Sequence, residues 1–294
     1  MQRGLALGVP ALALAAGAGV VAQVRRVANA PLPHFEDHDP SGTYGSPDGD
    51  TLTVTVLGDS TVTGPGLGAP SHSWIAQMVD RLPHRVELRS FAKGGSRVRD
   101  VLLNQAPQAV TEPTDVTVVA VGANDVFHAT PGWQVRRDLE ALLAVLAPAA
   151  PVVTLGVGDL SVIPRLPWAL RSMAAWRSGF VDAIHSQVCE PLEGVVRVPV
   201  SELSNPYFAE AGPEWWTPDM FHPSVVGHRL WADLFEPYMH TVLDMLFPLV
   251  DLRPATVPSE SASQVAEAVN EAADDGAAAH SHVANGYVRC NEHR

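Results

Sequence analysis

Lysine is almost missing from this 294-residue chain: Lys93 is the only one, and the arginines are scattered. The formal net charge is −13. A protein that binds nucleic acid needs clustered Lys and Arg opposite the phosphates, so the composition excludes that class of function. We expect the acidic excess to favour solubility instead of recognising a partner.

Cysteine is also scarce, and the two present, Cys189 and Cys290, lie far apart. They predict no structural disulfide and leave the redox compartment undetermined, and no CxxC or Cys/His metal spacing occurs. Two groups of metal-ligand residue types stand in polar sequence without helical or finger spacing, and solvated linker is the better interpretation of both. They are His34, Asp37, His38 and Asp39, and His280, His282, Cys290 and His293.

One long apolar run is present, from Gly4 to Val24, between Arg3 and the pair Arg25-Arg26. About twenty residues is the length at which a helix spans a bilayer. The run is either an uncleaved anchor or a signal peptide cut after Ala30, and a mobile apolar helix on a cytosolic protein is a third interpretation. Residues 1–30 therefore predict an extracytoplasmic protein, secreted or membrane-anchored, with a cytoplasmic one as the alternative.

Composition divides the remaining chain into three parts. Residues 31–50 are rich in proline, glycine and acids, which is typical of a linker. Residues 51–250 carry the regular apolar pattern of a folded domain. Residues 251–294 shift to Ala, Glu, Ser and Asp with few large apolar groups, and they predict a disordered acidic tail.

Within the domain, β-branched and apolar runs alternate with stretches of helical apolar spacing. The runs predict five strands, over 51–57, 85–91, 115–121, 152–157 and 195–198. The helical stretches cover 72–82, 96–105, 132–146, 167–188 and 224–246. This alternation indicates an α/β fold, a three-layer α/β/α sandwich around a doubly wound, flavodoxin-like five-stranded parallel sheet.

Ligands of doubly wound sheets bind at the carboxyl ends of the strands. Small and polar residues stand at these points in four groups: Gly58-Asp59-Ser60, Lys93-Gly94-Gly95-Ser96, Gly122-Ala123-Asn124-Asp125 and, before the last helix, Asp219-Met220-Phe221-His222-Pro223. Together they supply a hydroxyl, a glycine amide, a side-chain amide, a carboxylate and an imidazole.

These groups are the components of acyl transfer. A serine hydroxyl such as that of Ser60 is a weak nucleophile until a base removes its proton, and His222 can act as that base. Asp219, three residues before it, can orient the imidazole. The backbone N–H groups of Ser60 and Gly95 and the side-chain amide of Asn124 can converge on the oxyanion. Asp59 is interpreted as structural.

The four groups resemble the motifs of the SGNH (GDSL) hydrolase family of esterases and lipases. Its Gly-Asp-Ser block is matched at Ser60, its second glycine by Gly95 with Gly94 as the register alternative, its Gly-x-Asn-Asp block around Asn124, and its Asp-x-x-His-Pro block at 219–223. Ser90 departs from the Asn that many members have there. The resemblance covers residues 51–247 and implies esterase chemistry without a metal or an organic cofactor.

We therefore predict a serine esterase, carboxylesterase or lipase-like, that hydrolyses carboxylic ester bonds through an acyl-enzyme intermediate. The alternatives are an acyltransferase or deacylase acting on a sugar or lipid alcohol, and a non-catalytic membrane-tethered binding module. The expected substrate is a small-molecule, lipid or glycan acyl ester, membrane association is expected through residues 4–24, and the oligomeric state is unassigned. The aromatic segment 205–216 is either a packed loop or a wall of the substrate pocket.

Overall fold

The computed structural model describes residues 19, 22 and 33–247, which include every residue predicted to act in catalysis. The N-terminal anchor or signal segment, apart from two isolated positions, and the acidic tail over 251–294 lie outside the described residues. Among the helices that are described, none has the length and apolar character needed to cross a membrane.

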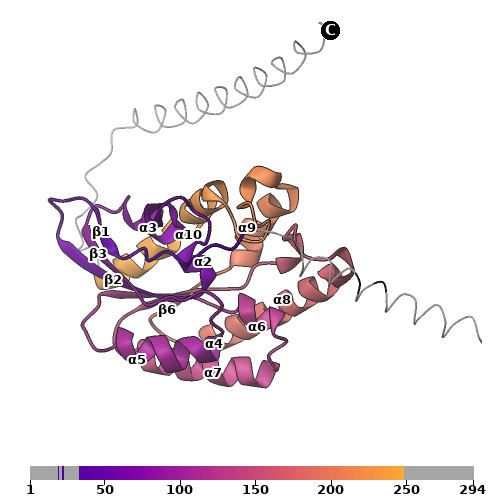
Figure 1. Cartoon of the computed structure of the whole chain (residues 1–294). Coiled ribbons are helices and arrows are strands. Elements are labelled where there is room, and N and C mark those ends of the chain that lie inside the picture. Colours follow the sequence, from indigo (N-terminus) through magenta and orange to yellow (C-terminus); the bar gives the residue numbers. More distant parts are fainter. Residues whose placement is uncertain (1–18, 20–21, 23–32, 248–294) are drawn as a thin grey trace, which may run out of the picture. The chain divides into compact units, whose positions relative to one another are not determined.

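A six-stranded sheet lies at the centre, between two layers of helices (Figure 1). Five strands are parallel and stand in the order β3-β2-β4-β5-β6. They are β2 (Thr51–Gly58), β3 (Arg85–Ser90), β4 (Val116–Ala120), β5 (Val152–Leu155) and β6 (Val195–Val198). With β2 counted as the first of the five, this is the flavodoxin-like order. The predicted fold class is confirmed.

The sixth strand, β1 (Gly42–Gly45), pairs antiparallel with the outer edge of β3 and corrects the prediction of a plain linker over 31–50. Asp37, expected to be solvated, accepts hydrogen bonds from Thr63 Oγ1 at 2.7 Å and from the Gly94 backbone N–H at 2.8 Å. This segment is therefore packed against the domain from Asp37 onward, and the sheet has one strand more than predicted.

Two hydrophobic cores lie on opposite faces of the sheet, which explains why β4 is buried at every position. One core contains α3 (Trp74–Val79) and α10 (Val225–Leu246). The other contains α4 (Val98–Asp100), the π-helical turn η2 (Val101–Gln105), α5 (Ala106–Ala109), α7 (Gly132–Leu146) and α8 (Trp168–Cys189). Figure 1 shows the two helical layers on either side of the strands.

The remaining helices are short or unpredicted. They are α2 (Ser60–Thr63), η1 (Pro70–His72), α6 (Ala123–Phe127), η3 (Leu160–Val162), α9 (Val200–Glu210) and η4 (Pro213–Trp215). The predicted loop over 205–216 is wrong in its first half, because α9 continues through Pro206 to Glu210. A proline inside a helix removes one hydrogen-bond donor, and the packing of Phe208 on Trp216 and Trp231 holds the segment in place.

A buried histidine of α10 gives the fold a pH dependence that can be measured. His228 Nδ1 accepts the Trp74 backbone N–H at 3.0 Å, and burial lowers the pKa of His228 to about 3. An unfolded histidine titrates near about 6.5. Between these two values only the unfolded chain holds this proton, so the free energy of unfolding falls as the pH falls, by up to about 1.4 kcal/mol per pH unit.

We expect His228→Gln, which retains an acceptor for Trp74, to flatten the pH dependence of stability by about one proton. Urea unfolding between pH 7 and pH 4 measures the slope. Equal slopes for wild type and His228→Gln would contradict the assignment.

Candidate active site

Ser60 stands where β2 meets α2, at the carboxyl edge of the sheet. Asp59 caps the helix, its Oδ1 accepting the Thr61 backbone N–H at 2.9 Å, and Ser60 is the first residue of α2. The turn is tight: a Cβ on Gly58 would lie 2.2 Å from the Ala120 carbonyl oxygen of β4. Only glycine fits at this position. Because Gly58 has no side chain, β2 can lie close against β4 up to its last residue, two positions before Ser60.

Two buried polar groups hold this turn. Gln105 donates from Nε2 to the Gly58 carbonyl at 2.9 Å and accepts the Gly58 N–H on Oε1 at 2.8 Å. Asp59 is fully buried, and burial raises the pKa of its carboxyl to about 6 against the lowering effect of its hydrogen bonds from Thr61 and Asn124. The structural role predicted for Asp59 agrees with these contacts.

His222 and Asp219 lie together in a closed loop. An antiparallel bridge pairs Trp216 with Pro223 across the loop, and the Thr217 backbone N–H donates to the His222 carbonyl at 2.8 Å. Met220, which lies between Asp219 and His222, has a φ of +55°, in the left-handed region that non-glycine residues rarely adopt. This sharp bend allows the carboxylate to reach the imidazole only three residues later.

The imidazole is oriented by the carboxylate. Asp219 Oδ2 lies 2.7 Å from His222 Nδ1, and Oδ1 accepts the backbone N–H of His222 at 3.0 Å and of Phe221 at 2.8 Å, with the Thr217 hydroxyl at 2.7 Å. Burial pushes the pKa of Asp219 upward, but the bonds from His222, Thr217 and Phe221 outweigh it and hold the pKa well below its usual range. An ionised Asp219 fixes the proton on Nδ1 and leaves Nε2 as the acceptor.

The second glycine is the better of two candidates for an oxyanion donor. The Gly94 N–H is already bonded to Asp37, and a Cβ there would lie 2.4 Å from Asp37 Oδ1. Gly95 has φ of +78°, and its surroundings leave open space within 4 Å of a Cβ. These contacts favour Gly95 over its register alternative.

Asn124 lies beside the nucleophile turn with its amide engaged by the protein. Its Nδ2 donates to Asp59 Oδ2 at 3.1 Å and to the Ser96 carbonyl at 3.1 Å. The adjacent Asp125 accepts the Val98 N–H at 2.9 Å and so ties the start of α6 to α4. An oxyanion bond from Asn124 therefore requires one amide hydrogen to be shared with, or released from, its present acceptor.

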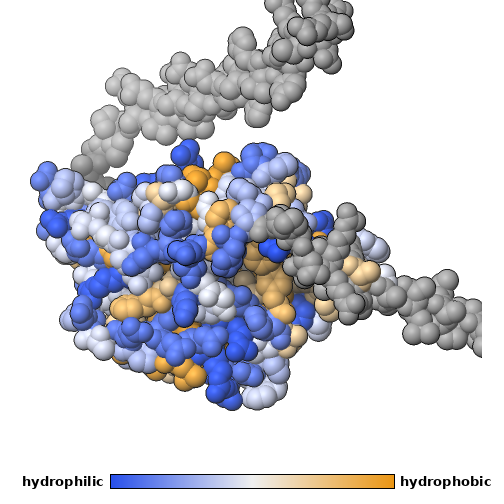
Figure 2. Space-filling model, in the orientation of Figure 1, coloured by the Kyte–Doolittle hydropathy of each residue, from blue (hydrophilic) through white to orange (hydrophobic). Residues whose placement is uncertain are grey.

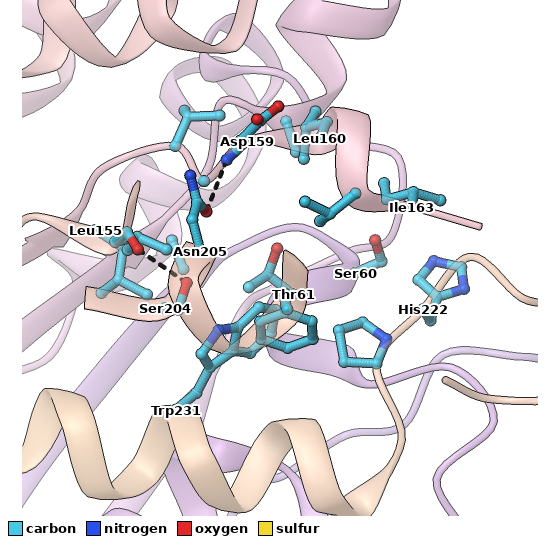
Figure 3. Close-up of a pocket in the computed structure, with 18 of the residues that line it drawn as sticks. Ser60, Thr61, Leu155, Asp159, Leu160, Ile163, Ser204, Asn205, His222 and Trp231 are labelled. Atoms are coloured by element: carbon cyan, nitrogen blue, oxygen red, sulfur yellow. Dashed lines mark hydrogen bonds between the residues drawn. The ribbon is translucent and has the colours of Figure 1, made fainter. Parts of the chain in front are cut away.

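Ser60 and His222 line one end of a cavity of about 120 Å³ (Figure 3). Its walls come from the ends of β4 and β5, from η3, α9 and α10, and are mainly apolar: Val157, Leu160, Ile163, Val200, Phe208, Trp216, Phe221, Trp231 and Phe235 are among them. The described residues provide no hydrogen bond between Ser60 Oγ and the imidazole, a contact that unliganded enzymes often hold loosely.

Several residues around the site carry no signal in the sequence. Gln105 and Asp37 hydrogen-bond to backbone groups and hydroxyls of residues that are distant in the sequence. An isolated polar residue in a helical stretch or a linker does not indicate such partners. For the segment 205–216 the prediction left two interpretations open, and Asn205, Phe208 and Trp216 all line the cavity. Among the described residues no cluster of ligands suited to a metal ion occurs.

Comparison with solved structures places the fold among known enzymes. A lipolytic protein of the G-D-S-L family from Veillonella parvula has a TM-score of 0.53 at 14% identity, over 63% of this chain and 96% of that one. LAE5, an alpha/beta hydrolase from the Lake Arreo metagenome, has a TM-score of 0.55 at 19% identity, over 66% of this chain and 97% of that one. A catalytic mutant of Axe2, an acetylxylan esterase from Geobacillus stearothermophilus, has a TM-score of 0.55 at 16% identity, over 65% of this chain and 95% of that one.

At these identities the likeness concerns the fold. No curated protein matches the sequence significantly. The family model is more specific, because residues 56–230 match that of the GDSL-like lipase/acylhydrolase family, a span that contains all four predicted motif blocks. The motifs, the sheet order and this match agree, and the chain belongs to the GDSL-like lipase/acylhydrolase family of ester-hydrolysing enzymes.

Proposed function

We propose that this protein is a serine esterase that cleaves carboxylic esters of medium-length apolar acyl groups through an acyl-enzyme intermediate. One observation carries the proposal: Ser60 and His222 line the same end of an apolar cavity, and Asp219 Oδ2 lies 2.7 Å from His222 Nδ1.

In the first half of the reaction, Ser60 Oγ attacks the acyl carbon while His222 Nε2 takes the hydroxyl proton. The carbonyl oxygen becomes an oxyanion, and the backbone N–H groups of Ser60 and Gly95, with the Asn124 amide, donate to it. The bond to the alcohol then breaks, and the imidazolium returns its proton to the leaving oxygen. The acyl group remains on Ser60.

In the second half, His222 removes a proton from a water molecule, whose oxygen attacks the acyl carbon. Collapse of the second tetrahedral intermediate breaks the bond to Ser60 Oγ, which takes back the proton, and the carboxylic acid leaves. Asp219 remains ionised throughout, because its four hydrogen bonds hold its pKa low, and it stabilises the imidazolium that forms in each half.

The nucleophile can be identified by covalent labelling. We expect a fluorophosphonate to add one phosphonyl group per chain and peptide mass spectrometry to place it on Ser60. Ser60→Ala should abolish the adduct. Ser204→Ala is the matched control, because Ser204 lines the same cavity but donates its hydroxyl to the Val200 carbonyl at 2.8 Å. An adduct that persists in Ser60→Ala would refute the assignment.

The cavity also predicts which acyl groups are preferred. An apolar cavity of about 150 Å³ admits benzene, so about 120 Å³ holds an acyl chain of about four to six carbon atoms. Each buried methylene contributes about 0.8 kcal/mol, or about fourfold. We expect kcat/KM for p-nitrophenyl esters to rise by about fourfold per methylene from acetyl to about hexanoyl and then to stop rising.

Filling the cavity should shorten the preferred chain. Ser204, buried on α9, lines the cavity and is labelled in Figure 3. Ser204→Leu should move the optimum toward acetyl esters, whereas Tyr207→Leu, at an exposed position of the same helix, should not. An optimum that is unchanged by Ser204→Leu would show that the acyl chain lies outside this cavity.

A further inference from the structure

The outer side of α8 carries an unusual row of large apolar side chains. Trp168 is 76% exposed, Met173 57%, Trp176 65% and Phe180 40%. The i+3 and i+4 spacing of Met173, Trp176 and Phe180 places these three along one side of the helix, which Trp168 begins. The rings of Trp176 and Phe180 stack with centroids 5.9 Å apart. Soluble proteins expose single apolar residues routinely, but a contiguous group indicates a surface that contacts a partner.

Within the stretch of sequence that contains this row, the charged residues are all arginines. No acidic residue occurs between Asp159 and Asp182, whereas Arg165, Arg171 and Arg177 lie between them, in a chain of formal net charge −13. Arg165 and Arg171 form no ion pair within the part of the chain that the structure describes. Seven other arginines do: Arg81, Arg85, Arg89, Arg97, Arg136, Arg137 and Arg197.

The row adjoins the mouth of the catalytic cavity. α8 packs against η3 and α6, and both elements contribute to the cavity lining, through Leu160 and Phe127. Phe127 is 38% exposed and packs on Phe221, next to His222, with ring centroids 5.4 Å apart. Figure 2 shows hydrophobic residues at the surface where α6 and α8 lie in Figure 1.

We propose that the α8 face, defined as Trp168, Met173, Trp176 and Phe180 with Arg165 and Arg171, docks on an anionic lipid surface. Tryptophan is the residue that favours the boundary between headgroups and acyl chains. Arg171 contacts only the backbone carbonyls of Leu166 and Pro164, both at 3.5 Å. Without a carboxylate partner, each arginine is available to anionic headgroups and is worth about fivefold in binding. Acidic side chains at this face would be repelled by anionic headgroups, and the stretch between Asp159 and Asp182 contains none.

Docking in this orientation brings the cavity mouth to the lipid–water boundary, where water-insoluble acyl esters reside. This consequence for substrate supply rests on the proposed function, but the docking itself does not. The surface is also distinct from residues 4–24, which the sequence predicts as an anchor or signal segment.

The test measures vesicle flotation of the full-length protein and, in parallel, of the same protein without residues 4–24, so that binding through that segment is separated from binding through the α8 face. Vesicles of phosphatidylcholine alone are compared with vesicles that also contain phosphatidylglycerol. We expect stronger binding to the anionic vesicles, weakened by salt. Trp168→Ser with Trp176→Ser should reduce binding by roughly tenfold or more. Arg165→Gln with Arg171→Gln should remove most of the preference for anionic lipid, again on the order of tenfold.

Met245→Ser is the matched control, because Met245 is 52% exposed on α10, in the other helical layer. Turnover of a soluble p-nitrophenyl ester by each variant shows that it is folded. Ser60→Ala separates the two proposals, since it should float like the wild type without hydrolysing the ester. Flotation of the tryptophan variant equal to that of the wild type would overturn the α8 proposal and assign binding elsewhere.

Failure of the wild type to float would overturn it as well. If the wild type then sedimented as a dimer that the tryptophan variant abolishes, the α8 face would belong to contacts between copies of the chain.

Discussion

Alanine in place of Ser60, of His222, or of both is expected to lower kcat/KM for a soluble ester by the same factor, on the order of a millionfold. The reason is that the two residues act in one step: a base without a nucleophile has no proton to take, and a serine without a base is a weak nucleophile. The second substitution therefore removes nothing that the first has left. Residual rate comes from binding and the oxyanion donors alone.

The measurement is a comparison of both single variants with the double variant on one p-nitrophenyl ester, after thermal unfolding has shown that all three are folded. Ser60 is partly exposed at the start of a helix and His222 lies in a loop, so neither change creates a large void in the core. Losses that multiply in the double variant would contradict a shared step and would separate the two residues mechanistically.

Asp219→Asn is expected to lower kcat by about ten-thousandfold while leaving the loop intact. The substituted amide keeps an oxygen for the Thr217 hydroxyl and the N–H groups of Phe221 and His222. Its NH2 group then faces His222 Nδ1, which can only accept from it. The ring proton moves to Nε2, and the base can no longer accept the proton of Ser60.

Thr217→Val provides the control for this effect, because it removes one hydrogen bond to Oδ1 and leaves the Oδ2 contact with the imidazole. A small loss is expected there. Nitrogen NMR of the His222 ring reports the tautomer directly and should show it reversed in Asp219→Asn alone. If Asp219→Asn lost no more activity than Thr217→Val, the carboxylate would have no orienting role.

The parallel core of the fold could be predicted because its signals are local. Strands such as β4 are buried on both faces and read as continuous apolar runs, and the five predicted strands agree with the observed ones to within two residues. The contact between Asp219 and His222 could be predicted for a similar reason, since three residues in one loop determine it.

The unpredicted features depend on partners that are distant in the sequence. β1 has four residues with a glycine at each end, and only the edge of β3 makes it a strand. Helix α9 continues through Pro206 because Phe208 packs on Trp216 and Trp231, which outweighs helix propensity. The two acceptors of the Asn124 amide come from separate turns, so the motif alone does not reveal that both hydrogens are engaged.

Asp37 has a consequence for any attempt to move this catalytic apparatus into another protein. It binds the backbone next to Gly95 and the last residue of the helix that Ser60 begins, from a position well before the first residue of the family match. A chimera that inherits only residues 56–230 would carry the motif residues and leave this brace behind. The transferable module therefore begins upstream of Asp37, although the family match begins at residue 56.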